Sequence, residues 1–339
     1  MKRFTALIVL VVSLVSVQVD ALEADQYQIW KNLSLPDSTD VVNQYLNEEL
    51  QTFLSTDINK RYHSLSCFDV AQKFMFYIRP HFFLDRLKRD LIQEGDATFY
   101  PESHNIFEAY HHSIYRGPVW PFIMPVAQTI RINNVFTGTD KIDHFFSSGR
   151  KYFRVYRRYL KKGLSSNEAE MKAIEYGNGE LQEKGILGYW SSAAFSYADL
   201  ESNYQGMRMG IDLCDAKQPV LEHDTATTWR VARPINIRHY VNPLWDEAFN
   251  NSYFLSFRKH GAEKVIKNEY CEMADDASVQ ALWREYQKRL KPSLHTDYLR
   301  GLMKVGAVPN PESQSLQSLC GFPKGKMDRP WVWGLPAHF

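Results

Sequence analysis

The chain has 339 residues, with 40 basic and 39 acidic side chains, a formal charge of +1 and 44% hydrophobic residues. This balance argues against a nucleic-acid partner, because such proteins need a clear basic excess. The length suffices for one large domain or two modest ones. Aromatic residues are spread along the whole chain, which favours a continuous core over disorder.

The first residues are typical of a secretory signal peptide. Two basic residues precede a mostly apolar run, Phe4 to Val19, and Val19-Asp20-Ala21 places small residues at a cleavage site. The run is shorter than a spanning helix usually needs, although an uncleaved anchor is the alternative. We therefore predict a signal peptide over residues 1–21, a mature chain over 22–339 without a transmembrane anchor, and a periplasmic or secreted location.

Four cysteines remain in the mature chain, at positions 67, 214, 271 and 320. An even number in an exported chain predicts two disulfides, for which three connectivities are possible. We favour Cys67 with Cys214 and Cys271 with Cys320. The absence of a C-x-x-C pair disfavours a thiolate zinc site. A catalytic cysteine is the alternative to the disulfides, and it is the less frequent state of an exported thiol.

Helical periodicity dominates the first half of the chain. An apolar stripe that follows the start signal at Ser38 predicts a helix up to about Leu54. Two further helices are expected over Phe68–Ile78 and Phe82–Ile92, divided at Pro80. Gln128–Gly138 alternates instead, with Asn133-Asn134 in its middle, and this pattern indicates a short β hairpin.

Three helices follow in a central motif, residues 139–213, at Thr139–Lys161, Ser166–Gln182 and Tyr197–Leu213. A loop or small β excursion is expected between the second and third. After Cys214 the chain is less regular up to about Gly261, and helices return at Ala262–Met273 and Ser278–Leu290. We predict a mainly α fold: a single helical domain with a small β hairpin and an irregular C-terminal wrap over 309–339.

Ionisable and amide side chains on the three central helices are spaced to face one way. They are Asp140, Lys141 and His144 on the first helix, Glu180 on the second, and Ser196, Asp199 and Asn203 on the third. Such groups are costly to bury unless they satisfy one another, so they mark either a structural polar network or a site. Taken singly, Asp140 is equally well explained as a capping acid, and His144 as a core histidine.

Two glycines share the face of Asp199 and Asn203 on the third helix, Gly206 and Gly210. Each costs about 1 kcal/mol of helix propensity relative to alanine. We expect close backbone packing against the His144 helix to offset this cost.

The pattern D-K-x-x-H-F, then G-x-x-E or G-x-E, then S-x-x-D-L-x-x-N-x-x-G resembles the VanZ-like proteins and their small envelope-associated relatives. The match covers about Asp140 to Gly210, a quarter of the chain. The resemblance implies a shared helical motif and an envelope setting, and one branch of those proteins is associated with glycopeptide-antibiotic resistance. Those relatives carry the motif on membrane helices, whereas Arg154, Arg157 and Lys161 would not be tolerated in lipid here.

These observations favour a hydrolase acting on an envelope substrate such as peptidoglycan or glycolipid. Its predicted catalytic residues are Asp140, His144, Glu180 and Asp199, and its predicted substrate-binding residues are Lys141, Ser196, Asn203, Tyr189 and Trp190. One version uses a divalent metal, held by a histidine nitrogen and carboxylates. A second version resembles lysozyme-type glycosidases, with Glu180 as the acid and aromatic rings stacked on sugars. The alternative is a non-enzymatic binding or scaffolding protein whose polar cluster is structural.

Two other segments carry chemistry-bearing residues. The triplet Glu222-His223-Asp224 is interpreted as a surface loop, because adjacent residues do not face one way on a helix. The segment Asn242–Asn250 contains Asp246 and Glu247 and could border a cleft. No P-loop, G-x-S-x-G or dinucleotide signature is present in the chain.

Overall fold

The computed structural model describes residues 23–61, 64–78, 91, 97–102, 105–116, 126–178, 193–225, 228–291 and 293–322. The predicted signal peptide, most of the predicted Phe82–Ile92 helix and the C-terminal stretch from residue 323 lie outside these ranges. In the described residues helices predominate, and each sheet has only two or three strands. The prediction of a mainly α fold with a small β hairpin is confirmed, and the structure adds further short strands to it.

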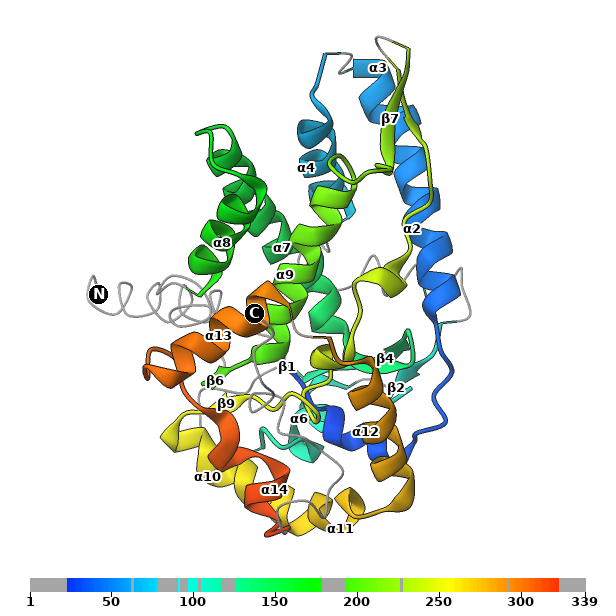
Figure 1. The fold of residues 1–339 in the computed structure, drawn as a ribbon. Helices are drawn as coiled ribbons and strands as arrows, with labels where there is room; N and C mark the ends of the chain where they lie inside the picture. Colours follow the sequence, from blue (N-terminus) through cyan, green and yellow to red (C-terminus); the bar gives the residue numbers. More distant parts are fainter. Residues whose placement is uncertain are drawn as a thin grey trace, which may run out of the picture.

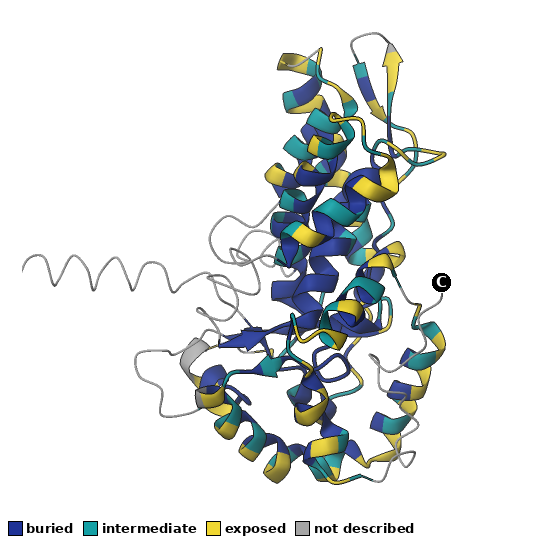
Figure 2. Cartoon of the chain, turned by 60° about the vertical axis from the view of Figure 1, so that its left-hand side comes forward, coloured by how far each residue is buried: buried dark blue, intermediate teal, exposed yellow. Residues whose placement is uncertain are grey.

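The helices of the upper half in Figure 1 are gathered around α7 (Thr139–Leu160), which packs against three others: α4 (Cys67–Ile78), α8 (Ser166–Gly177) and α9 (Tyr197–Asp212). The long helix α2 (Thr39–Phe53) stands at the edge of this group and contacts α4. Buried residues concentrate where these helices meet the short strands, and exposed residues cover their outer faces (Figure 2).

Local sequence signals set the boundaries of these helices. The predicted apolar stripe of α2 is buried, and a capping box between Ser165 and Glu168 starts α8 as expected. Ser196 caps α9 by accepting a hydrogen bond from the backbone N–H of Asp199 at 3.1 Å. The three central helices therefore begin where the sequence predicted. For α8, the predicted last residues, 179–182, lie outside the described ranges.

Short strands place the N-terminal ends of α7 and α9 side by side in the middle of the molecule. The predicted hairpin is formed by β4 (Thr129–Ile132) and β5 (Val135–Gly138), which are joined by a turn through Asn133 and Asn134 at positive φ. β2 (Phe99–Tyr100) pairs with β4 on the side away from β5. β1 (Glu23–Ala24) runs parallel to β3 (Val126–Ala127), and β6 (Ala194–Phe195) pairs with β9 (Tyr253–Phe254). β5 leads directly into α7, and β6 leads into α9.

The lower half in Figure 1 is built mainly from the C-terminal third of the chain. Its elements are η2 (Gln26–Lys31), α6 (Ile106–His112), α10 (Ser256–Val265), η6 (Ile266–Tyr270), α11 (Cys271–Ala274), α12 (Ala277–Arg289), α13 (Leu294–Lys304), η7 (Pro311–Gln314) and α14 (Leu316–Leu319). The predicted start at Ala262 is wrong, because this helix already begins at Ser256. Helix α13 was not predicted.

A second hairpin, β7 (Leu221–Thr225) with β8 (Thr228–Val231), corrects the interpretation of the Glu222-His223-Asp224 triplet. These residues lie on a strand rather than in a loop. Arg230 of β8 forms ion pairs with Glu222 and Asp224, and the ring of Trp229 packs against that of His223 at 3.7 Å. Cross-strand pairs of this kind stabilise the hairpin.

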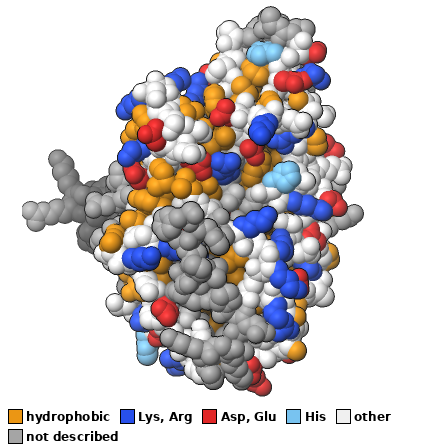
Figure 3. Space-filling view, in the orientation of Figure 1, with side chains coloured by type: hydrophobic (Ala, Val, Ile, Leu, Met, Phe, Trp, Pro, Cys, Tyr) orange, Lys and Arg blue, Asp and Glu red, His pale blue; other side chains and the backbone are white. Residues whose placement is uncertain are grey.

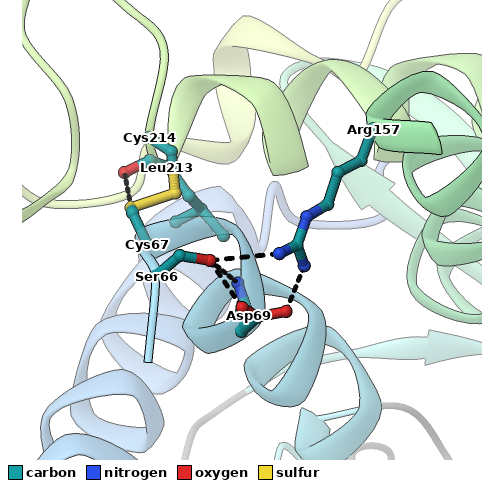
Figure 4. The surroundings of a disulfide bond; sticks show 6 residues. All are labelled: Ser66, Cys67, Asp69, Arg157, Leu213 and Cys214. Atoms are coloured by element: carbon teal, nitrogen blue, oxygen red, sulfur yellow. Dashed lines mark hydrogen bonds and ion pairs between the residues drawn. A yellow bond between two sulfur atoms is a disulfide. The ribbon is translucent and has the colours of Figure 1, made fainter. Parts of the chain in front are cut away.

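Both favoured disulfides are formed, Cys67–Cys214 and Cys271–Cys320, and no free cysteine remains. The first joins the start of α4 to the residues after α9 (Figure 4). Beside it, Arg157 of α7 pairs with Asp69 and lies 3.1 Å from Ser66 Oγ, so α7 is tied to the same corner. Two disulfides fit a secreted protein. Within the described ranges, no helix is long and apolar enough to cross a membrane.

Candidate functional site

The N-terminal ends of α7 and α9 bring six of the predicted site residues into one cluster. Asp140 and Lys141 occupy the first turn of α7, and His144 lies one turn further on. Ser196 caps α9, which also carries Asp199 and Asn203. The predicted close packing of the two helices accompanies this arrangement: a β-carbon added at Gly206 would lie 1.9 Å from the carbonyl oxygen of Phe145.

Lys141 lies at the centre of the cluster with its side chain 0% exposed. Its Nζ is 2.5 Å from Asp140 Oδ2, 2.6 Å from Asp199 Oδ1 and 2.7 Å from Glu247 Oε1. Burial by itself would lower the pKa of Lys141, but the three carboxylates outweigh burial and raise it well above its ordinary value. The ammonium is therefore a permanent cation that holds three acids together.

Two further acidic residues complete the cluster, Glu247 and Glu23. Glu247 follows η5 (Pro243–Trp245), which packs against α9 and β5. The Ser196 hydroxyl donates to its Oε1 at 2.8 Å, and the buried Tyr115 hydroxyl donates to its Oε2 at 3.1 Å. Glu23 is buried on β1, which contacts α7 and β5. Oxygen atoms of Glu23, Asp140, Asp199 and Glu247 all lie within 4.8 Å of one another.

His144 connects the buried cluster to solvent. Its Nε2 lies 3.2 Å from Asp199 Oδ2, and its Nδ1 lies 3.2 Å from Asn203 Oδ1. The imidazole is 26% exposed, whereas the side chain of Asp199 is 4% exposed. Nε2 faces the Asp199 carboxylate as a donor, whereas the role of Nδ1 depends on the tautomer and on the orientation of the Asn203 amide.

The two predicted acids respond to this environment in opposite directions. Burial raises the pKa of Asp140 to about 6, with the neighbouring carboxylates of Asp199 and Glu247 adding to the effect and Lys141 opposing it. Burial also acts to raise the pKa of Asp199, but His144 and Lys141 outweigh it, so the pKa of Asp199 is lowered. Asp199 is therefore the stable carboxylate, and Asp140 is the one able to carry a proton near neutral pH.

Asp140 does not act as the capping acid that the sequence left as an alternative. The residue before α7 is Gly138, with no side-chain cap, and Asp140 Oδ1 is buried without a hydrogen-bond partner. Ser196 is fully buried, and its hydroxyl donates to Glu247 and accepts from the N–H of Asp199. Both residues thus face the cluster.

Three predicted site residues, Glu180, Tyr189 and Trp190, lie outside the described residues, so their positions relative to the cluster stay predictions. Sequence reasoning placed Glu247 only in a segment bordering a cleft, and it missed Glu23 and Tyr115 altogether. Glu23 and Tyr115 lie outside the matched motif and outside any periodic segment, so no pattern marked them.

The chain matches no protein-family model, no curated protein and no solved structure in the three comparisons made. The VanZ-like resemblance therefore stays a prediction, and the chemistry has to be argued from the cluster itself. On the described face in Figure 3, acidic and basic side chains are interspersed, in agreement with the near-neutral composition.

Proposed function

We propose that the protein is an exported cell-envelope hydrolase in which His144 transfers protons, acting on a substrate such as peptidoglycan or glycolipid. The observation that supports this most is the pairing of a partly exposed imidazole with a buried carboxylate, Asp199, at 3.2 Å. A histidine oriented by a buried acid is a recurrent general base, because the carboxylate stabilises the imidazolium that forms.

In this proposal Asp199 orients the ring through Nε2, and Lys141 keeps Asp199 ionised. Nδ1 is then the nitrogen that accepts a proton from the attacking water. That water inserts between Nδ1 and the Asn203 side chain, which are now in direct contact, and the Asn203 amide binds the water. Lys141 itself binds the buried carboxylates rather than the substrate, since its ammonium already has three carboxylate partners.

Glu180 supplies the leaving-group proton in the lysozyme-like version of the proposal, with Tyr189 and Trp190 stacking on sugar rings. This assignment depends on sequence alone. In the metal-assisted version the cluster carboxylates would hold a divalent ion, which would supply an activated water, and His144 accepts the proton. The two versions differ in their response to chelation, because only the second loses activity in EDTA.

The test is the release of soluble muropeptides from purified peptidoglycan, and of the headgroup from glycolipid. His144→Gln should reduce the rate by about 10²- to 10⁴-fold, the usual contribution of a general acid or base. His112→Gln is the matched control, because His112 is exposed on α6. Equal rates for the two variants, or no release by the wild-type protein from either substrate, would remove the proposal.

A second function, a periplasmic binding or scaffolding protein, is favoured by one specific observation. The most central member of the cluster, Lys141, is fully buried and ion-paired three times, which suits a network that holds helices together. Removing one partner of a buried pair costs about 3–5 kcal/mol. If Lys141→Met lowers the melting temperature strongly while His144→Gln changes neither stability nor any activity, this second function is the correct one.

A further inference from the structure

The buried cluster holds more negative than positive charge. Four buried carboxyl groups, those of Glu23, Asp140, Asp199 and Glu247, surround one ammonium. The ammonium of Lys141 balances only one of four carboxylates, and a charged His144 would balance only one more. Buried charge without a counter-charge is costly, so the site favours either protonation or an additional cation.

A second observation, independent of charge, indicates a missing partner on one side of the cluster. Asp140 Oδ1 is buried and has no hydrogen-bond partner, although Oδ2 of the same carboxylate holds Lys141. The fully buried side chain of Gln26 is also without a partner at both its Oε1 and its Nε2. A β-carbon added at Gly138 would lie 2.0 Å from Asp140 Oδ1 and 3.0 Å from Gln26 Nε2, so these two groups flank the same point.

We propose that this cluster binds a hard divalent cation, Ca²⁺ or Mg²⁺, through Glu23, Asp140, Asp199 and Glu247. The Gln26 amide, whose Nε2 lies on the Asp140 side, becomes a further ligand when it turns its oxygen towards the ion. The donor set consists of carboxylate and amide oxygens, which these ions prefer, whereas zinc favours nitrogen and sulfur donors. His144 lies outside the set, because its Nε2 faces Asp199. The site does not depend on the hydrolase proposal.

Lys141 competes with the ion, because it already contacts oxygens of three of the four carboxylates. Binding therefore draws Asp140, Asp199 and Glu247 away from the ammonium in part. The affinity should be modest, with a Kd of about 10⁻⁴–10⁻³ M, as in extracellular calcium modules. Removing the positive charge of Lys141 should strengthen binding.

Binding can be measured without any activity, by calorimetry and thermal unfolding of EDTA-treated full-length protein titrated separately with CaCl₂, MgCl₂ and ZnCl₂. Ca²⁺ or Mg²⁺ should raise the melting temperature at millimolar concentration, and Zn²⁺ should not do so preferentially. Glu247→Gln should weaken binding about tenfold or more, since affinity follows the number of charged ligands. Glu285→Gln is the matched control, an exposed glutamate paired with Lys288.

Lys141→Met separates the outcomes further. It should bind the cation at least about tenfold more tightly than the wild type, and its lowered melting temperature should recover when the ion is added. The inference is overturned if the wild-type protein neither binds Ca²⁺ or Mg²⁺ nor is stabilised by them at about ten times the expected Kd. This holds even if Lys141→Met binds, because the ammonium would then fill the natural site alone. Muropeptide release tests the hydrolase separately.

Discussion

Gly206→Ala tests whether the contact between α7 and α9 positions the cluster. Gly206 faces α7 directly, and an added β-carbon would lie 1.9 Å from the carbonyl oxygen of Phe145 and 3.0 Å from the Cα of Gly149. Both atoms belong to the backbone of α7, so no side chain can rotate away. The alanine variant can fold only if the two helices move apart.

The size of the effect follows from two opposing terms. Alanine is worth about 1 kcal/mol more than glycine in a helix interior. Overpacking a filled interface costs about 1–3 kcal/mol and occasionally more, and a contact with rigid backbone falls at the upper end. We expect a net loss of about 2 kcal/mol, which lowers the melting temperature of a chain of this length by about 3 °C.

Gly301→Ala is the matched control, because Gly301 lies inside α13 and a β-carbon there would meet nothing within 4 Å. This variant should gain up to about 1 kcal/mol. Urea unfolding followed by circular dichroism measures both changes against the wild type. If Gly206→Ala were as stable as Gly301→Ala, the helices would not be in backbone contact, and the site built on their N-terminal ends would have to be abandoned.

Three further predictions concern the rest of the molecule. Hydrogen bonding to Arg157 lowers the pKa of Asp69 to about 2. In urea titrations the stability difference between wild type and Asp69→Asn should therefore be constant above pH 4 and vanish as the pH falls from 3.8 to 2. Solvent screening limits this difference to about 1 kcal/mol, and a difference that persists unchanged at pH 2 would contradict the pairing. Replacing Cys67 and Cys214 by serine should cost at most about 5 kcal/mol, because the disulfide closes a loop of 147 residues, and an unchanged unfolding midpoint would contradict this. Mass spectrometry of the exported protein should find Leu22 as its first residue, and an intact leader would refute the predicted cleavage.

The central helices were predictable because their signals are local. An apolar stripe, a capping box at Ser165 and the glycines on one face of α9 each constrain a few neighbouring residues. The glycines also predicted a tertiary contact, since their cost in helix propensity had to be offset by close packing. Gly206 confirms that reasoning, because its backbone touches that of α7.

The remaining members of the cluster were not predictable, because nothing local marks them. Glu247 follows a short 3-10 turn, and Glu23 lies on a two-residue strand. Their arrival in the cluster depends on long-range contacts: β1 with α7 and β5, and η5 with α9. Tyr115 likewise reaches Glu247 across 132 residues of sequence. Periodicity carries no information on pairings of this range.

The fold itself helps to explain how so many acids are buried around one lysine. Asp140 lies in the first turn of α7 and Asp199 in the first turn of α9, where the positive ends of the helix dipoles favour a carboxylate. Glu23 and Glu247 have no such support from a helix, and Glu247 accepts from two hydroxyl groups in addition to its ion pair with Lys141. Glu23 and Glu247 are therefore the two carboxylates of the cluster that no helix dipole stabilises. A cation that binds here should depend most on Glu23 and Glu247, and Asp199 should retain its hold on His144 whether the ion is bound or not.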